Sequence, residues 1–182
     1  MTSAILDPTL LMRAAVRNAA VALLLQYVPQ AGGRIFRGRI WPITSTMLPA
    51  LLVYAWDEDK QNVATAGGAP DFNVSLTLRV DARAEAATAE ALEDLLDTLV
   101  TGMQNALLLN PDWVACFALI ERCATNYQLL PGGDRPAGEA QIALTLRWQE
   151  LYAEGLLERL SLLAARFTTA DGTVLAGADI QP

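Results

Sequence analysis

The sequence has 182 residues, which suffices for one domain with a substantial buried core. Its composition, 53% hydrophobic and 18% charged, excludes a disordered chain. Its formal net charge of −7 argues against tight binding to nucleic-acid phosphates, because that binding depends on Lys and Arg.

The uninterrupted apolar run from Ala19 to Leu25 is far shorter than the roughly 20 residues that cross a bilayer. The N-terminal residues also lack a positive segment followed by an apolar stretch and a cleavage site. We therefore expect a soluble, cytoplasmic protein without membrane contact.

The sequence lacks the motifs of several common catalytic and nucleotide-binding sites. There is no histidine, which excludes Ser-His-Asp and Cys-His arrangements, and no P-loop or G-x-G-x-x-G motif occurs. The two cysteines, Cys116 and Cys123, do not have the spacing of a zinc site, and we expect both to be small core residues. The sequence predicts no enzyme, no cofactor and no metal.

The first predicted element is a helix that begins at Asp7 and Pro8, a favourable start, and ends near Gln26. Apolar residues occupy nearly all of its circumference, so we expect the sheet and a further surface to cover it. Gly32 and Gly33 form a turn, and a short strand follows from Arg34 to Ile40.

Pro42 and Pro49 enclose a polar bend before an apolar strand, Ala50 to Trp56, which should be buried on both faces. Because a proline cannot donate to the ladder, Pro49 fixes where this strand begins. Asp57, Glu58 and Asp59 then form a solvated strand end, and Lys60 to Pro70 is a flexible loop.

Strict alternation of apolar and polar residues from Phe72 to Asp81 predicts a strand with one buried face. Helical periodicity follows from about Ala86 to Leu109. One face of this helix is acidic and is formed by Glu90, Glu93, Asp94 and Asp97. We expect these carboxylates to interact favourably with the helix dipole, because they lie in the first turns of the helix. The alternatives are an inter-subunit contact or a catalytic acid and base.

Asn110, Pro111 and Asp112 end that helix. Trp113 to Leu130 is predicted as a long strand with an irregularity near Glu121 and Arg122, and the last strand runs from Ala140 to Gln149. The predicted fold is α+β: a mixed or antiparallel sheet of about four to five strands with two helices on one face. We assign residues 1–154 to this domain and residues 155–182 to a C-terminal arm.

Four segments in this order resemble the tail terminator, or tail completion, proteins of long-tailed bacteriophages. They are LMRAAVRNAAVALL, RIFRGRIWPITSTMLPALLVYAWDED, FNVSLTLRVDA followed by ALEDLLDTLV, and AQIALTLRWQELY. The resemblance spans about residues 8 to 153, and its specificity comes from the order of the elements and from LPALLVYAWDED.

The resemblance implies a structural virion protein that forms a hexameric ring on the head-proximal end of the tail tube. Such a ring stops tube polymerisation and offers a surface to the head–tail connector or neck protein, and a sheath protein is a further partner in tails that have one. It assembles in the host cytoplasm and lies at the head–tail junction, and DNA passes through without specific binding.

The residues themselves suggest where subunits meet. Charge complementarity and sheet-edge position favour Arg37, Arg39, Asp57, Glu58 and Asp59 as an oligomer or tube interface. For the three acidic residues, binding of a divalent cation is the alternative. For the whole chain, the alternatives are a neck or head-completion protein, a tail-tube subunit, or a small-ligand binding protein or enzyme that uses the acidic helix face.

Overall fold

The computed structural model describes residues 12–38, 43–64, 70–130 and 135–151. The helices are α1 (Met12–Tyr27), α2 (Ala89–Leu108) and α3 (Pro111–Val114), with 3-10 turns at Pro29–Ala31 and Ser45–Met47. The strands are β1 (Ile35–Arg37), β2 (Ala50–Ala64), β3 (Asp71–Glu85), β4 (Leu119–Leu130) and β5 (Ala137–Leu151). They form one sheet in the order β1-β2-β3-β5-β4.

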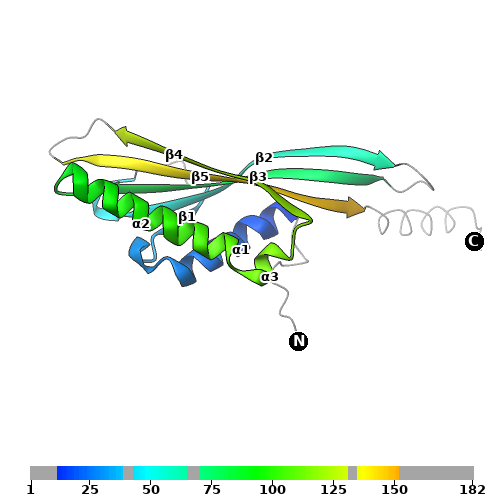
Figure 1. Cartoon of the computed structure of the whole chain (residues 1–182), viewed down its shortest axis with the longest axis horizontal. Helices are drawn as coiled ribbons and strands as arrows, with labels where there is room; N and C mark the ends of the chain where they lie inside the picture. The colour runs from blue at the N-terminus through cyan, green and yellow to red at the C-terminus, as the bar shows by residue number, and fades with distance from the viewer. Residues whose placement is uncertain (1–11, 39–42, 65–69, 131–134, 152–182) are drawn as a thin grey trace, which may run out of the picture. The chain divides into compact units, whose positions relative to one another are not determined.

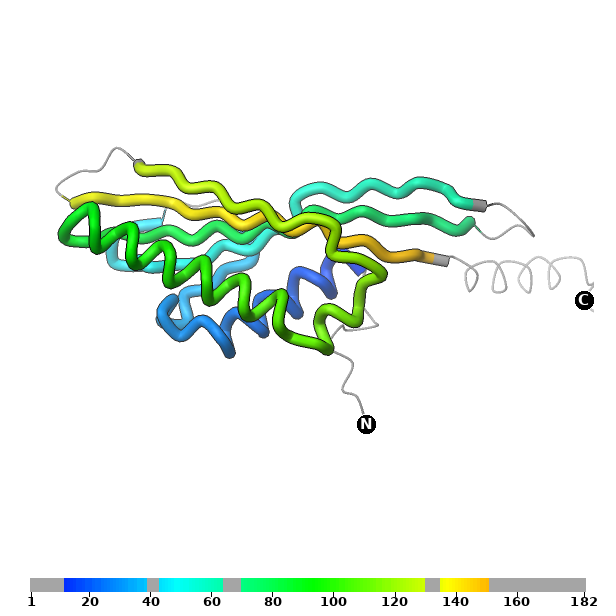
Figure 2. Tube along the Cα trace, in the orientation of Figure 1, coloured from blue at the N-terminus to red at the C-terminus, as the bar shows by residue number. Residues whose placement is uncertain are grey.

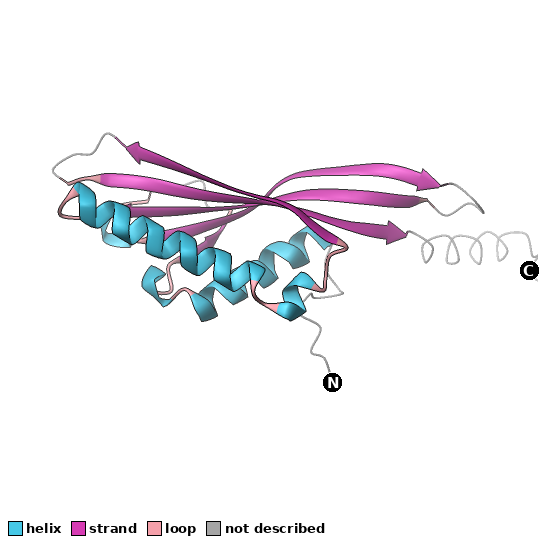
Figure 3. Ribbon diagram, in the orientation of Figure 1, coloured by secondary structure: helices cyan, strands magenta, loops and turns pink. Residues whose placement is uncertain are grey.

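The sheet is mixed, because β1 pairs with β2 in parallel and β4 pairs with β5 in antiparallel fashion. Figures 1 and 3 show both long helices on the same face of the sheet. The predicted α+β fold, with two helices on one face of a five-stranded sheet, is therefore confirmed.

The described residues fall into two compact units. One lies within residues 1–60 and 74–148, and the other holds the described parts of residues 61–73 and 149–182. The predicted boundary between residues 154 and 155 and the C-terminal arm lie outside the described residues, as does the predicted helix start at Asp7 and Pro8.

The strands β3 and β5 build the centre of the core. Their even-numbered residues are buried against the helices: Val74, Leu76, Leu78, Val80, Ala140, Ile142, Leu144 and Leu146. Their odd-numbered neighbours therefore point to the opposite face, because successive strand residues alternate. The alternation predicted for both strands is confirmed.

Helix α2 begins where a threonine caps it and packs directly on β5. The side-chain oxygen of Thr88 accepts a hydrogen bond from the backbone N–H of Ala91 at 3.2 Å. At the contact, a Cβ atom on Gly138 would lie 3.0 Å from Cδ1 of Leu96 and 3.3 Å from Cδ2 of Leu92. The close approach of helix and strand therefore depends on a residue without a side chain.

The substitution Gly138→Val should lower the free energy of unfolding by about 1–3 kcal/mol, because the added isopropyl group would press on Leu92 and Leu96. Chemical denaturation measures this change. Ala143→Val, on the same strand but facing away from the helices, is the matched control and should have little effect. Equal losses for the two variants would contradict the packing described here.

Three predicted boundaries are wrong. The first strand ends at Arg37 rather than Ile40, because Gly38 has a left-handed φ of 54° and bends the chain. Asp57 to Asp59 do not end a strand, since β2 continues to Ala64 through residues 60–64, which were predicted to be loop. The start at Ala50, directly after Pro49, is confirmed.

The third error concerns the chain after α2. Residues 113–118 precede β4, and Trp113 belongs to helix α3. Asn110 does not only end α2: its Oδ1 atom accepts a hydrogen bond from the backbone N–H of Trp113 at 3.0 Å and caps α3. Figure 2 shows how the chain turns there and returns along β4. The irregularity predicted near Glu121 is confirmed as a register shift between Ile120 and Arg122.

Candidate functional site

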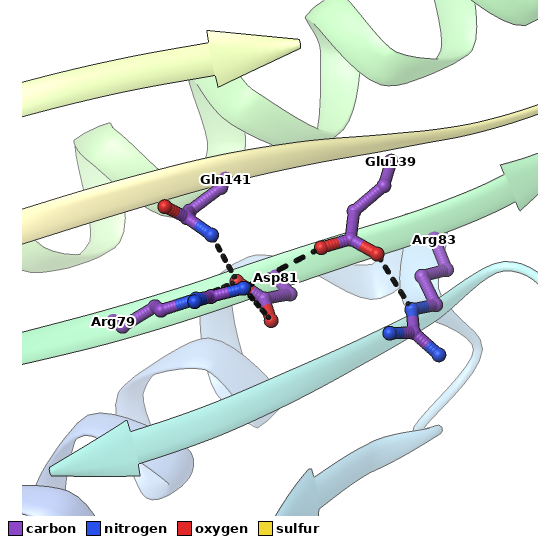
Figure 4. A network of polar contacts seen from close by, with 5 residues as sticks. All are labelled: Arg79, Asp81, Arg83, Glu139 and Gln141. Carbon is purple, nitrogen blue, oxygen red and sulfur yellow. Dashed lines mark hydrogen bonds and ion pairs between the residues drawn. The ribbon is translucent and has the colours of Figure 1, made fainter. Parts of the chain in front are cut away.

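The face of the sheet opposite the helices, which we call the open face, carries a connected polar cluster (Figure 4). Its members are Arg79, Asp81 and Arg83 on β3 and Glu139 and Gln141 on β5. All five are odd-numbered residues, so the alternation that buries the core also places them together.

Asp81 is the centre of this cluster and is only 2% exposed. Arg79 donates to both of its carboxylate oxygens, at 2.7 and 3.0 Å, and Gln141 donates to Oδ1 at 3.1 Å. These hydrogen bonds to the Asp81 carboxylate raise the pKa of Arg79 above its ordinary value. A buried carboxylate with three hydrogen bonds is thus held in one orientation.

Glu139 completes the cluster by joining the two arginines. It accepts a hydrogen bond from Nε of Arg83 at 2.9 Å and lies 3.7 Å from Nη2 of Arg79. Two guanidinium groups therefore face two carboxylates, and their formal charges cancel. Such a surface can be covered by another protein without leaving an unpaired charge.

Two aromatic side chains of β2 lie beside this cluster. Trp56 is 61% exposed, and the guanidinium carbon of Arg79 lies 4.9 Å from its ring centroid. Tyr54 meets Trp56 edge to face, with 6.2 Å between ring centroids. The hydroxyl of Tyr54 has a raised pKa, first because of burial and then because of Asp81. An exposed tryptophan beside an ordered arginine is typical of a contact surface.

The predicted interface residues that the structure describes lie outside this cluster. Arg37 is exposed and donates to Oδ1 of Asn18 on α1 at 3.0 Å. Asp57 and Asp59 are exposed within β2, and Glu58 lies 3.7 Å from Lys60. Arg39 lies outside the described residues, so its predicted part in the interface stays a prediction.

The edge of β2 offers a second surface. Strand β1 pairs with β2 at only three positions, ending at Val53, and no other described strand lies on that side of β2. Farther along, the carbonyl oxygen of Ala55 accepts a hydrogen bond from Nη2 of Arg13 at 2.6 Å. The acidic residues Asp57, Glu58 and Asp59 follow on this same edge strand.

The acidic face of α2 is exposed, as its four carboxylates are on the solvent side of the helix. Asp94 and Asp97 line a groove of about 900 Å³ with Tyr27 and Leu109. Within the described ranges, His, Cys, Asp and Glu do not gather in groups of three or more that could hold a metal ion. None of the described helices has both the length and the apolarity to cross a membrane.

The prediction that both cysteines are core residues is wrong. Cys123 is exposed and Cys116 is half-buried, and neither forms a disulfide. Cys123 belongs to the edge strand β4, and burial of part of its side chain raises the pKa of its thiol. Partial burial also raises the pKa of Cys116, and Asp112 adds to the effect. Both side chains are therefore held as neutral thiols.

Tyr127 on β4 is linked to α2, because its hydroxyl donates to Oδ1 of Asp97 at 2.8 Å. Burial, followed by this hydrogen bond, raises its pKa from 10.0 to about 12. Since the folded state holds the phenol proton more tightly, the contribution of Tyr127 to stability is present below pH 10 and is lost as the pH rises from 10.0 to about 12.

In a spectrophotometric titration at alkaline pH, one tyrosine should therefore ionise with a midpoint near pH 12. Tyr127→Phe should remove that component from the titration curve. Tyr27→Phe, which replaces a tyrosine of similar exposure at the end of α1, should leave the component in place. If the late component survives in Tyr127→Phe, the assignment to Tyr127 is wrong.

The open-face cluster was missed by the sequence analysis, although a signal was present. Arg79, Asp81 and Arg83 alternate in charge along the polar face of β3. Their partners Glu139 and Gln141 are about 60 residues away in the chain, and only the adjacency of β3 and β5 brings them together.

Comparison of the sequence with known proteins adds no assignment: no family model matches it, and no curated protein is a significant match. The function is therefore inferred from the residues and their arrangement.

Proposed function

We propose that this protein is a structural virion protein that forms a ring, a homohexamer, on the head-proximal end of a phage tail tube. The ring ends tube growth sterically, because it covers the surface on which the next tube ring would add. Its other surface receives the head–tail connector or neck protein. No bond is made or broken in this role, and no cofactor is required.

The observation that carries this proposal is the open face of the sheet. Both long helices lie on the other face, so the described chain leaves one side of its sheet uncovered. That side holds Trp56, which is 61% exposed, beside a cluster whose formal charges cancel. Exposed tryptophan and arginine carry much of the binding energy in protein interfaces. A ring subunit needs such surfaces for its neighbours.

The charged residues at the sheet edge indicate how neighbouring subunits would be oriented. Arg37 lies on the edge strand β1, whereas Asp57, Glu58 and Asp59 lie farther along β2. A basic position and an acidic segment at separate places on one subunit fit a head-to-tail interface, which closes into a ring. The net charge of −7 also suits a channel that DNA passes through, since negative walls repel phosphates.

The substitution Trp56→Ser should weaken ring formation by about tenfold or more, because a buried tryptophan at an interface contributes on the order of 2 kcal/mol. Native mass spectrometry measures the ring population. Leu25→Ser, which changes a residue that is 49% exposed on α1, is the matched control and should leave it unchanged. A chain that stays monomeric in isolation should be assayed on purified tail tubes instead.

Electron microscopy of particles assembled without the protein tests the role itself. Loss of a terminator should give abnormally long tubes. Tails of normal length that fail to join heads would instead support a neck or head-completion protein, and absence of tubes would support a tube subunit. Either result would overturn the terminator proposal.

A further inference from the structure

Strand β4 is the outermost strand of the sheet, and among the described strands it pairs with β5 alone. Its charged residues, Glu121 and Arg122, lie at the register shift near its start. From Cys123 to Leu130 the strand has neither a charged residue nor a proline. Sheet edges normally carry such residues, since they prevent the addition of another strand. This edge is therefore open to pairing.

A pocket of about 370 Å³ lies beside this edge, between β4 and α2. Its walls are Glu93, Leu96 and Asp97 from the helix and Tyr127, Gln128 and Leu129 from the strand. Leu129 is 64% exposed and Tyr127 is 52% exposed, so both present apolar surface to a partner. The lining contains two carboxylates and no basic residue.

Two side-chain hydrogen bonds hold the helix and the strand at a fixed separation. Tyr127 donates to Asp97 at 2.8 Å, and Nε2 of Gln104 donates to Oγ1 of Thr125 at 3.1 Å. Leu96, only 2% exposed, forms the apolar floor between the two carboxylates. The pocket is thus formed before any partner arrives, which lowers the entropic cost of binding.

We propose that the edge of β4 and this pocket together bind an extended peptide segment of a partner protein, added as a further strand, whose pocket-facing side chains alternate between apolar and basic. Its backbone pairs with β4 from Cys123 onward. Every second side chain points toward α2, where an apolar group contacts Leu96 and Leu129 and a Lys or Arg meets Glu93 and Asp97.

Charge favours a different protein over a second copy of this chain as the partner. The long strand at the other side of the sheet, β2, carries Asp57, Glu58 and Asp59, which would face an acidic pocket. Two β4 edges paired with each other would bring two copies of Glu93 and Asp97 together. Strand β1 contains basic Arg37 but has only three residues. The inference does not depend on the proposed ring.

Fluorescence anisotropy tests the proposal on the full chain. The probe is a short synthetic peptide in which every second residue is threonine and the residues between them are leucine and lysine in turn. This peptide should bind saturably and about tenfold or more tightly than the same peptide with glutamate in place of lysine. N-methylation of the backbone amides that face β4 should abolish binding, whereas N-methylation in the other register should not. Equal binding of the lysine and glutamate peptides would overturn the proposal.

Two leucines of β4 provide matched variants. Leu129→Lys changes the pocket and should reduce binding of the lysine peptide by about tenfold or more, because it adds a positive charge and removes an apolar contact. Leu119 lies on the same strand before the register shift and is 53% exposed. The Leu119→Lys variant should bind the lysine peptide as tightly as the unmodified protein does.

Sedimentation velocity tests the remaining possibility, which is that a second copy of this chain occupies the edge of β4. If the unmodified protein self-associates and Leu129→Lys alone abolishes this association, the edge of β4 is occupied by a second copy, and the proposed basic partner is wrong. Unchanged association in Leu129→Lys, together with its loss of peptide binding, is the expected result.

Discussion

Replacing Trp113 with alanine should lower the free energy of unfolding by about 3–5 kcal/mol, the largest effect that we expect from any single substitution. Its indole ring is fully buried beside the end of α2. It contacts Phe117 edge to face, with ring centroids 4.9 Å apart, and Phe117 in turn lies 6.3 Å from Trp148 of β5. Removing the indole opens a cavity that this aromatic group cannot fill.

The variant Trp113→Phe distinguishes packing from hydrogen bonding. Nε1 of Trp113 is buried without a hydrogen-bond partner among the described residues, so phenylalanine sacrifices no hydrogen bond. The loss should then be about 1–2 kcal/mol, as expected from the smaller ring volume alone. Denaturant titration of both variants measures these changes. A loss in Trp113→Phe as large as that in Trp113→Ala would show that the indole N–H is essential.

The second large effect is expected for Asp81→Ala, which should lower the free energy of unfolding by about 2–3 kcal/mol. The substitution removes the acceptor of three hydrogen bonds from Arg79 and Gln141. Arg79 would retain one ion pair, with Glu139 at 3.7 Å, and its contact with the ring of Trp56. Because only 27% of the Arg79 side chain is exposed, water compensates only in part for the lost carboxylate.

A matched control exists elsewhere in the sheet. Glu121 and Arg147 also form a two-contact ion pair, with distances of 2.8 Å, but their side chains are 41% and 51% exposed. Glu121→Ala should therefore cost no more than about 1 kcal/mol. Thermal and chemical denaturation measure the loss of stability in Asp81→Ala and in Glu121→Ala. If both variants lose the same stability, burial does not strengthen the Asp81 pair, and the open-face cluster is not a fixed structure.

The central elements were predictable because one periodicity determines each of them. The alternation in β3 and β5 has a period of two, and the buried stripe of α2 has the period of a helix. Burial on one side of each element produces these patterns directly. Strand β2 was predictable only where it is apolar, from Ala50 to Trp56; its polar continuation to Ala64 is held by backbone pairing, which leaves no hydrophobic pattern.

Trp113 was wrongly predicted to start a strand, because the residues before it are ambiguous. Asn110 and Pro111 are compatible with the end of one helix and with the start of the next. The tertiary structure made the decision: Trp113 is buried in a short helix beside α2. The exposure of Cys123 likewise follows from the position of β4 at the sheet edge, which no local pattern records.

The candidate site shows the same division. Sequence reasoning placed the interface in Arg37 and Arg39 and in Asp57 to Asp59, the conspicuous charges of their segments. It had no means of joining Arg79 and Asp81 to Glu139, since the contact requires β3 and β5 to be neighbours in register. The pocket between α2 and β4 depends in the same way on which strand lies at the edge.

The sequence by itself determined which side of β3, β5 and α2 is buried, because apolar periodicity is a property of the chain alone. It also determined the α+β class. Only the tertiary structure decided the strand order, and with it the cluster around Asp81, the exposed Trp56 and the open edge of β4. The physical reason is that strand pairing joins backbone groups, which every residue has, so residues distant in sequence become neighbours without a local signal.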